Sequence, residues 1–423
     1  MSAPTILDDL LARGLVHDST DADALRARLN EGPITVYAGF DPTALSLHVG
    51  NLVPLLLLRR FQQFGHRPVA LAGGATGMIG DPGGRSTERT LLDAATLDAN
   101  LAAISAQLTR LLVFDGGATG AVLVDNRDWT APMGVLEFLR DVGKHVTVNT
   151  MLAKDSVKSR VDSDAGISFT EFSYMLLQAN DFRHLHDTMG VELQVGGSDQ
   201  WGNITAGIDL IRRTSGGHVH GLTVPLVTRA DGQKFGKSAD GAVWLSPELT
   251  TPYAFFQYFM QVDDRDVERF LLQLTLLPVD EVRAIVVDHL TEPGARRAQR
   301  ALALAVTELV HGRDEAERAA GASQGFTRAV AELTDDDWRE LASSLPVLEV
   351  RAADLGRELV EFLADNGAVA SRSEGRRLIA QAGLSLNDVA VTEGRALAAE
   401  DLVSGWAMVR RGKKQRFVLH QVD

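Results

Sequence analysis

The 423-residue sequence predicts an α/β protein in which a doubly wound parallel sheet precedes an α-helical region and a small α+β module. Three observations support this order. In the first half, short apolar segments alternate with segments of helical periodicity, which is typical of a parallel sheet covered by helices on both faces. From about residue 251 the periodicity becomes helical throughout. Residues 351–423 then form a separate stretch with two basic clusters.

The sheet region divides into short apolar strands and longer amphipathic helices. The expected strands cover residues 33–40, 66–74, 121–126 and 191–196. The expected helices cover residues 52–64, 96–113, 133–142, 169–179 and 201–213. Ligands of such sheets bind at the carboxyl ends of the strands. The expected binding region is therefore made of the polar segments that follow the strands, at residues 39–43, 73–81, 126–129 and 196–200.

The second half is expected to contain a helical domain, a linker and a terminal module. Thr251 is a suitable N-cap residue, and Pro252 follows it at the first helical position. This start opens a helical domain over residues 251–325. An acidic, proline-containing stretch indicates a linker over residues 326–350, and residues 351–423 form the terminal module.

Composition restricts the classes of function. The chain has no run of 18 apolar residues that would span a membrane, and no cysteine for disulfides or thiolate metal sites. A formal net charge of −14 argues against general nucleic-acid binding. Residues 351–423, however, hold 11 Lys and Arg against 10 Asp and Glu, so local basic patches can still bind one RNA. The N-terminus does not have the pattern of a signal peptide, and a cytoplasmic enzyme is expected.

Two short segments far apart in the chain carry the strongest functional signal. His48-Val49-Gly50-Asn51 follows an apolar strand and a polar turn, and it opens a helix. Backbone N–H groups at such a helix start suit a nucleotide phosphate. Lys234-Phe235-Gly236-Lys237-Ser238 is a loop with two lysines three residues apart. Ammonium groups on a loop suit an anion whose charge grows during a reaction.

Three polar residues on one predicted helix indicate a further feature. Tyr174, Gln178 and Asp181 are spaced i, i+4 and i+7, so they share a helix face. Because the residues around them are largely apolar, these polar groups need partners. One interpretation is a structural hydrogen-bond cluster, and the other is a pocket for a polar amino acid.

Together with residues 73–82, 169–181 and 196–203, these motifs resemble those of the bacterial tyrosyl-tRNA synthetases, which are class I aminoacyl-tRNA synthetases. The first segment is similar to the His-Ile-Gly-His signature of that class, and the second to Lys-Met-Ser-Lys-Ser. The departures are Val49, Asn51, Phe235 and Gly236, of which Asn51 keeps a hydrogen-bond donor. The resemblance covers essentially the whole chain.

The resemblance implies a domain plan. Residues 1–228 would form a Rossmann-like catalytic domain, and residues 229–250 would carry the lysine loop and the connection that follows it. The helical domain and linker come next, and residues 351–423 would form an S4-like RNA-binding domain.

The resemblance also implies roles for individual residues. The implied tyrosine-binding residues are Tyr37, Asp81, Tyr174, Gln178, Asp181 and Gln200. The implied ATP-binding residues are Gly39, Asp41, His48, Gly50, Asn51, Gly197, Asp199, Lys234, Phe235, Gly236, Lys237 and Ser238. The residues implied in catalysis are His48, Asn51, Thr43, Arg85, Lys234 and Lys237. In the terminal domain, the implied RNA contacts are Arg372, Arg376, Arg377, Lys413 and Lys414.

The implied activity is that of a tyrosine–tRNA ligase. Such an enzyme activates L-tyrosine with ATP to give tyrosyl-adenylate and pyrophosphate, and then transfers the tyrosyl group to the 3′-terminal adenosine of tRNA(Tyr). Mg²⁺ is expected to arrive with ATP, and no protein-bound structural metal is expected. The resemblance further implies a homodimer without membrane association.

Two alternatives belong to different classes. A tryptophanyl-tRNA synthetase would share the architecture, but it has no acid–tyrosine pair for a phenol, so Tyr37 with Asp181 argues against it. A non-catalytic RNA-binding protein on the same scaffold should have lost the lysine loop or residues 73–81, and both are intact.

Overall fold

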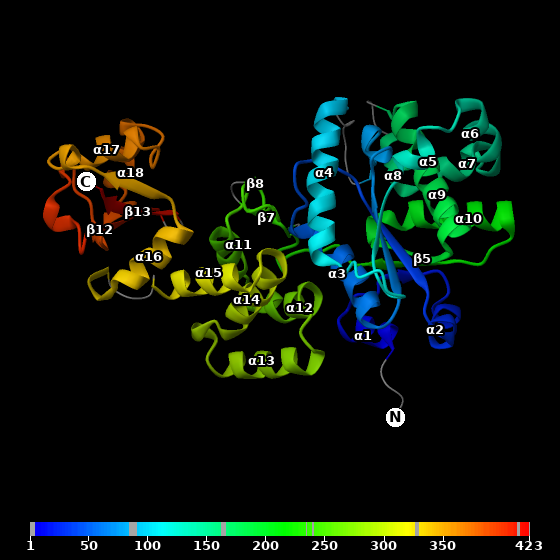
Figure 1. Cartoon of the computed structure of the whole chain (residues 1–423), viewed down its shortest axis with the longest axis horizontal. Helices are drawn as coiled ribbons and strands as arrows, with labels where there is room; N and C mark the ends of the chain where they lie inside the picture. Colours follow the sequence, from blue (N-terminus) through cyan, green and yellow to red (C-terminus); the bar gives the residue numbers. More distant parts are fainter. Residues whose placement is uncertain are drawn as a thin grey trace. The chain divides into compact units, whose positions relative to one another are not determined.

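The computed structural model describes residues 5–83, 91–161, 166–233, 235–238, 241–325, 330–412 and 415–422. Figure 1 shows the chain coloured along its sequence. The chain divides into two compact units. The first contains Met1–Thr250 and Met260–Val310, and the second contains Thr251–Phe259 and His311–Asp423.

The first unit is built around a six-stranded sheet with the strand order β1-β6-β5-β2-β3-β4. Its strands are β1 (Asp18–Ser19), β2 (Thr35–Phe40), β3 (Arg67–Ala72), β4 (Val122–Asp125), β5 (Val191–Gly197) and β6 (His220–Val224). Neighbouring strands from β6 to β4 pair in parallel, whereas the short edge strand β1 runs antiparallel to β6. The predicted α/β fold with a parallel sheet is confirmed, and β1 makes the sheet mixed.

Helices cover both faces of this sheet. In Figure 1, α3 and α4 lie on one side, and α9 and α10 lie on the other. Their apolar faces and the strand residues between them, such as Val36 and Leu193, are almost fully buried. The helices up to this point are α1 (Ile6–Ala12), α2 (Ala22–Glu31), α3 (Val49–Gln63), α4 (Ala94–Leu111), α5 (Arg127–Thr130), α6 (Val135–Asp141), α7 (Val148–Leu152), α8 (Asp155–Val161), α9 (Phe169–Met189) and α10 (Trp201–Ser215).

Two of these helices are longer than predicted. Helix α3 begins at Val49 rather than at residue 52, because His48 caps it. The His48 Nδ1 accepts from the Gly50 N–H at 3.0 Å, and the Asn51 Oδ1 accepts from the His48 N–H at 3.0 Å. Helix α9 continues past residue 179 to Met189 and ends at Gly190, whose φ of 64° favours glycine.

The first unit also contains the hairpin β7 (Lys237–Ser238) and β8 (Gly241–Ala242), and the helices α12 (Asp264–Leu274), α13 (Val279–Thr291) and α14 (Arg297–His311). Helix α12 is bound to α3 through a buried arginine. Arg60 of α3 donates to the carbonyls of Leu272, Gln273 and Thr275 at the end of α12. A cation suits the carboxyl end of a helix. Burial lowers the pKa of Arg60 to about 9.

The second unit contains the helices α11 (Pro252–Met260), α15 (Arg313–Gly325), α16 (Asp335–Ser344), α17 (Leu359–Asp365) and α18 (Arg372–Ala380). Its five-stranded sheet has the order β11-β10-β12-β13-β9. The strands are β9 (Val347–Val350), β10 (Leu384–Leu386), β11 (Val389–Ala390), β12 (Trp406–Arg411) and β13 (Gln415–Gln421). Leu359, Phe362 and Leu419 are completely buried in the core between this sheet and α17.

The segment expected to be a linker contains regular structure, so that expectation is corrected from residue 335 onward. Helix α16 is capped by Thr334 and buries Trp338, and β9 pairs in parallel with β13. The acidic first turn of α16 resembles a solvated linker in composition. Such charges, however, also stabilise a helix start, and only the burial of Trp338 distinguishes the two cases.

Among the residues that the structure describes, no helix has both the length and the apolar character needed to cross a membrane.

Candidate active site

A chain of hydrogen bonds connects the carboxyl ends of three adjacent strands. Asp41 follows β2, Thr76 follows β3 and Asn126 follows β4. The Thr76 hydroxyl donates to Asp41 Oδ1 at 2.7 Å, and Asn126 Nδ2 donates to the Thr76 oxygen at 3.0 Å. Asn126 Oδ1 accepts from the Ala75 N–H at 2.7 Å. The strand ends are therefore tied into one polar floor, as the sequence predicted for this edge of the sheet.

Asp181 of α9 lies on this floor and is almost completely buried. It accepts from Asn126 Nδ2 at 2.9 Å and from Trp129 Nε1 at 2.8 Å. Burial raises the pKa of the Asp181 carboxyl to about 7, although the two donors act in the opposite direction. A carboxyl with a pKa this far above its ordinary value is typical of a functional site.

Tyr37 of β2 is buried with its hydroxyl unsatisfied. Its side chain is 1% exposed, and its oxygen has no hydrogen-bond partner among the described residues. Burial, and then the charge of Asp181, raise the pKa of Tyr37 well above its ordinary value, so the phenol remains protonated. A buried donor without a partner is rare in a native protein and indicates a place where a ligand supplies one.

Tyr174 of α9 contacts another acid of this floor, Asp41. Its hydroxyl donates to Asp41 Oδ2 at 2.8 Å, and the pKa of Tyr174 is raised by burial and then by the charges of Asp41 and Asp81. The structure thus places Asp41 beside Tyr174 and Thr76, inside the network assigned by resemblance to tyrosine. Two carboxyl groups near one phenol create a site that favours a cation.

A second cluster surrounds Asp81. Gln200 Nε2 donates to Asp81 Oδ2 at 2.7 Å, and Asn203 Nδ2 donates to the same oxygen at 3.4 Å. Gln178 Nε2 in turn donates to Gln200 Oε1 at 3.2 Å. The structure therefore links Gln178 of α9 to the Asp81 carboxyl group through Gln200.

Several residues assigned to ATP lie at the exposed margin of these clusters. Gly39, Thr43, His48 and Asp199 are exposed, and Gly197 is partly exposed. A Cβ on Gly197 would lie 2.6 Å from Asp199 Oδ1, so a larger residue there would displace the Asp199 carboxylate. These positions combine exposure with close backbone approach, which suits a nucleotide.

The two signature segments meet in space. The Val49 N–H donates to the Val243 carbonyl at 2.9 Å, and the Val243 N–H donates to the Gly236 carbonyl at 2.9 Å. Gly236 has a φ of 92°, and a Cβ on it would lie 3.3 Å from the Gly50 nitrogen. The backbone of the lysine loop therefore lies against the start of α3, where His48 is.

Some predicted site residues are only partly described. Arg85, Lys234, Lys413 and Lys414 lie outside the described residues. Of Lys237 and Ser238 the structure describes the backbone, which forms β7. The side chain of Phe235, assigned to ATP by resemblance, is only 7% exposed and packs on Phe270 with the ring centroids 4.2 Å apart.

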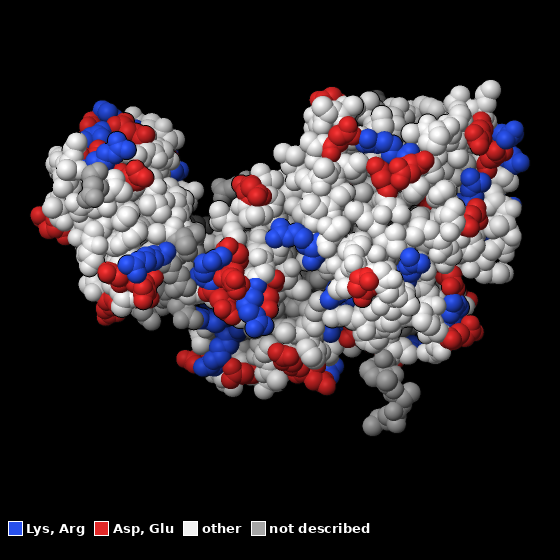
Figure 2. All heavy atoms as spheres, in the orientation of Figure 1, with Lys and Arg blue, Asp and Glu red and all other residues white. Residues whose placement is uncertain are grey.

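The predicted RNA contacts that are described lie on the exposed face of α18. Arg372 pairs with Glu361 of α17 at 2.6 Å, and Arg376 pairs with Glu358, the N-cap residue of α17, at 3.5 Å. Arg377 is exposed. Figure 2 shows Lys and Arg side chains interspersed with Asp and Glu on the visible face of the molecule.

Sequence reasoning missed four members of the site: Thr76, Asn126, Trp129 and Asn203. All four stand within or just after the polar segments that follow β3, β4 and β5. Their position relative to the strand ends was therefore the available signal. Among the described residues, no three His, Asp or Glu side chains are grouped so that they could hold a metal ion.

Comparison with known proteins places this geometry in a family. The model of the tRNA synthetases class I (W and Y) matches residues 29–327. The tyrosine–tRNA ligase of Opitutus terrae is 53% identical over 97% of this chain and 98% of its own, and that of Roseiflexus castenholzii is 48% identical over 99% and 100%. The C-terminally truncated mitochondrial tyrosyl-tRNA synthetase of Aspergillus nidulans superposes with a TM-score of 0.70 at 33% identity, covering 76% of this chain and 94% of that one. The chain therefore belongs to the class I tRNA synthetases of the tryptophan and tyrosine group.

Proposed function

We propose that the chain is a tyrosine–tRNA ligase that selects its amino acid through Tyr37 and Asp181. The observation that carries this proposal is the buried, unsatisfied hydroxyl of Tyr37 in the field of the Asp181 carboxyl. A phenol can pair with both groups, because its oxygen accepts from Tyr37 while its hydrogen is donated to Asp181. The relatives that match over nearly the full length are tyrosine–tRNA ligases.

Selection against phenylalanine follows from the same two groups. In this proposal Tyr37 donates to the phenolic oxygen of the substrate, and the substrate hydroxyl donates to Asp181. Phenylalanine would fill the space, leave the Tyr37 hydroxyl unpaired, and offer Asp181 no donor beyond Asn126 and Trp129. An unpaired buried polar group costs about 1–3 kcal/mol. The indole of tryptophan has a donor but no acceptor, so it could not satisfy Tyr37.

At the other end of the amino acid, the ammonium group would be held by acidic and amide oxygens. The proposed partners are Asp81, Tyr174 and Gln178, with Gln200 near the reacting carboxylate. The hydrogen bond from Gln200 to Asp81 supports this assignment. It orients the Gln200 amide, and the Asp81 carboxylate can still accept a further hydrogen bond from the ammonium group. The tyrosine carboxylate is already ionised at neutral pH, so its attack needs no general base.

Adenylation in this proposal depends on positioning and charge stabilisation. The carboxylate attacks the α-phosphorus of ATP, the new bond forms a mixed anhydride, and pyrophosphate leaves. The side chains of His48 and Asn51, at the positive end of the α3 dipole, would bind the phosphates, with Thr43 nearby. Gly39, Asp41, Gly50, Gly197 and Asp199 would border the nucleotide. Mg²⁺ would enter with ATP as part of that substrate.

The loops would neutralise the leaving group. Lys234 and Lys237, together with Arg85, would approach the pyrophosphate as its charge develops, with Phe235, Gly236 and Ser238 shaping the loop. Contacts made mainly in the transition state raise the rate rather than the substrate affinity. The position of Gly236 against Gly50 supports this role, because it keeps the loop beside the phosphate-binding helix start.

The transfer step would engage RNA through the terminal domain. A ribose hydroxyl of the 3′-terminal adenosine attacks the carbonyl of tyrosyl-adenylate, and AMP leaves. We propose that the S4-like RNA-binding domain starts with β9 rather than at residue 351, since β9 belongs to its sheet. Arg372, Arg376, Arg377, Lys413 and Lys414 are the proposed phosphate contacts, and the first two would exchange glutamates for phosphates.

A homodimer would cover an apolar surface on α6, α7 and the start of α9. Val135, Leu136, Leu139, Val148 and Phe169, on α6, α7 and the start of α9, have exposed fractions of 50–78%. Large exposed apolar groups that gather in one region mark an interaction surface. We expect Leu136→Asp to convert the dimer to a monomer in sedimentation experiments. A monomeric wild-type protein would contradict the proposal.

The amino-acid dependence of ATP–pyrophosphate exchange tests the proposed activity. We expect exchange with L-tyrosine and none above background with phenylalanine or tryptophan. Charging of tRNA(Tyr) should then proceed with tyrosine alone. Exchange stimulated by tryptophan instead would assign the chain to the tryptophanyl-tRNA synthetases. If none of the three amino acids stimulated exchange, a non-catalytic RNA-binding role would be favoured.

A further inference from the structure

Helix α12 carries an ion pair with a buried carboxylate, for which neither substrate binding nor the family signatures give a role. Asp266 and Arg269 are spaced i, i+3 and lie 2.5 Å apart. The Asp266 side chain is 4% exposed and that of Arg269 is 38% exposed. Burying the Asp266 carboxylate is costly in free energy unless hydrogen bonds compensate, so the further partners of the pair indicate its role.

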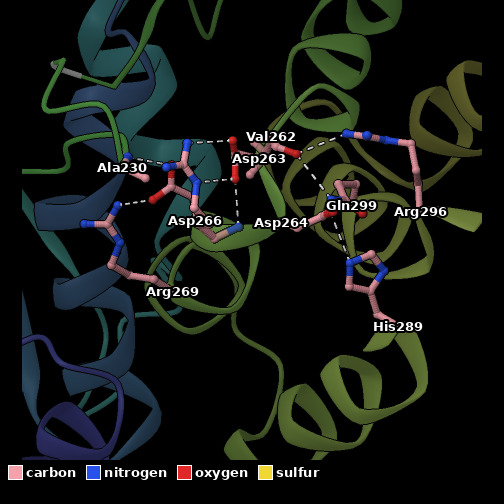
Figure 3. A network of polar contacts seen from close by, with 10 residues as sticks. Ala230, Val262, Asp263, Asp264, Asp266, Arg269, His289, Arg296 and Gln299 are labelled. Atoms are coloured by element: carbon pink, nitrogen blue, oxygen red, sulfur yellow. Dashed lines mark hydrogen bonds and ion pairs between the residues drawn. The ribbon is translucent and has the colours of Figure 1, made fainter. Parts of the chain in front are cut away.

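Those partners are backbone groups at the entry to the lysine loop. The Ala230 N–H donates to Asp266 Oδ2 at 2.8 Å, and Arg269 donates to the Thr228 carbonyl at 2.5 Å. Figure 3 shows Ala230, Asp266 and Arg269 converging at this point. One acceptor and one donor on α12 therefore fix two backbone groups that lie two residues apart in the loop entry.

Phe235, which follows Lys234 in the loop, is also held by α12. The Phe235 ring packs on Phe270, and both side chains are nearly buried, at 7% and 1% exposure. The Phe235 N–H donates to the Val227 carbonyl at 3.0 Å, which draws the two arms of the loop together. Helix α12 therefore contacts the chain on both sides of Lys234 in sequence.

The opposite end of α12 is fixed to the helix that carries the first signature. Arg60 of α3 binds three carbonyls at the carboxyl end of α12, and α3 starts at the His48 cap. The two signature segments are therefore attached to the same pair of helices. A rigid two-helix frame of this kind sets the distance between functional groups more precisely than a loop alone.

A second ion pair on α12 gives a contrast. Arg265 pairs with Asp263, the N-cap residue, at 2.9 Å, and both side chains are largely exposed. The hydrogen bonds described for this pair join its two members to each other and do not reach the loop. Figure 3 shows Asp263 apart from Ala230. The hydrogen bonds described for this pair therefore stay within it, whereas those of Asp266 and Arg269 reach the loop backbone.

We infer that Asp266 and Arg269 are positioning residues for adenylation, which hold the entry of the lysine loop so that Lys234 and Lys237 reach the leaving pyrophosphate. The inference rests on the proposed function. Neither residue has a described contact with Tyr37, Asp181 or the Asp81 cluster. We therefore expect them to affect the position of the loop without affecting the binding of the amino acid. Displacing a catalytic group by about 1 Å can lower a rate about 100-fold.

Single-turnover formation of tyrosyl-adenylate by the full-length protein provides the test, with Arg265→Gln as the matched control. We expect Arg269→Gln to lower the maximal rate about 10- to 100-fold, with the tyrosine dissociation constant within about twofold of wild type. Arg265→Gln removes the same charge from the same helix and should leave the rate unchanged. The melting temperatures of the two variants should shift by similar small amounts.

Two further variants keep the inference falsifiable if Arg269→Gln folds poorly. Asp266→Asn retains an acceptor for Ala230 but loses the charge that holds Arg269, and Arg269→Lys retains charge but not the forked geometry. Both should show a smaller loss of rate in the same direction. Unchanged rates, or a loss of tyrosine affinity equal to the loss of rate, would overturn the inference. A wild-type protein without tyrosine-dependent exchange would instead overturn the proposed function itself.

Discussion

At the scale of single residues, the distinguishing feature of the candidate site is a buried carboxyl group, that of Asp181, whose pKa is close to neutral pH. Asp181 accepts two hydrogen bonds, from Asn126 and Trp129, yet burial still raises its pKa to about 7. The protein thus keeps an ionisable acceptor where water is excluded. A substrate hydroxyl that donates to Asp181 would favour the ionised form, so tyrosine binding and deprotonation of Asp181 should be coupled.

This shift predicts a pH dependence of stability in the free protein. The folded-state pKa of Asp181 lies above the ordinary value of 3.8, so the folded state binds the proton more tightly than the unfolded state. The stabilisation is complete below about pH 4 and is lost as pH rises through about 7, amounting to at most about 4 kcal/mol. Denaturant unfolding of wild type and Asp181→Asn should therefore differ in pH dependence between pH 4 and 8. Parallel curves would show that Asp181 does not titrate in this range.

Tyr37→Phe tests the unsatisfied hydroxyl. Because the variant removes a buried donor without a partner, we expect the free protein to be at least as stable as wild type, by up to about 1 kcal/mol. Tyrosine affinity should nevertheless fall about tenfold, equivalent to about 1.4 kcal/mol, since the substrate loses a donor. Calorimetric binding with tyrosine and phenylalanine measures both effects. A variant that became less stable and kept full tyrosine affinity would contradict the assignment.

The sequence allowed much of this residue-level picture to be predicted. Tyr174, Gln178 and Asp181 could be grouped because helical spacing alone places them on one face. Asn126 and Trp129 could not be grouped with Asp181, since their contact depends on how β4 and α9 pack in three dimensions. The spacing of residues along one helix can be taken directly from the sequence. A hydrogen bond between residues 52–55 positions apart in the chain depends on the tertiary structure.

At the scale of elements, the lysine loop and the start of α3 are in backbone contact. Gly236 lies against the first turn of α3 with a positive φ, so it combines two constraints that other loop glycines do not share. Gly232, in the same loop, also has a positive φ of 82°, but a Cβ there would meet no atom within 4 Å. A substitution at Gly232 would therefore introduce backbone strain alone, whereas one at Gly236 would introduce both backbone strain and a steric contact.

We expect Gly236→Ala to reduce adenylation more than Gly232→Ala does. Both variants should lose about 1 kcal/mol of stability through backbone strain. Only Gly236→Ala adds a group 3.3 Å from the Gly50 nitrogen, which would move the loop and lower the adenylation rate about tenfold. Pyrophosphate exchange and thermal unfolding on both variants make the comparison. Equal rates in the two variants would rule out a role for this contact.

The boundaries of elements were less predictable than their existence. Helix α3 starts earlier than expected because a histidine acts as its cap, which is an uncommon choice of residue for that position. The strand β9 escaped detection because it has four residues and its partner β13 lies about 70 positions later. A short strand is recognisable only when its partner is known.

At the scale of the whole molecule, the chain separates adenylation residues from the proposed RNA contacts. Deleting residues 326–423 removes α16 and the complete terminal sheet, whereas a cut at residue 351 would leave β9 without its partner. We expect the shorter protein to keep tyrosine-dependent exchange within about threefold of wild type and to lose tRNA charging. The related Aspergillus protein was crystallised as a C-terminally truncated chain. Full tRNA charging by the truncated protein would show that RNA binds elsewhere.

The pairing of β9 with β13 also dictates an order of events during synthesis. The first unit can assemble once α14 has been made, but β9 must wait for a partner that the ribosome adds about 70 residues later. At about 5–20 residues per second, that delay is about 4–14 s. In this interval the Val-Leu-Glu-Val segment is an unpaired strand, and Glu349 gives it a charge that discourages pairing with other nascent chains. Replacing Glu349 with valine should therefore increase aggregation of the newly made protein more than it changes the finished fold.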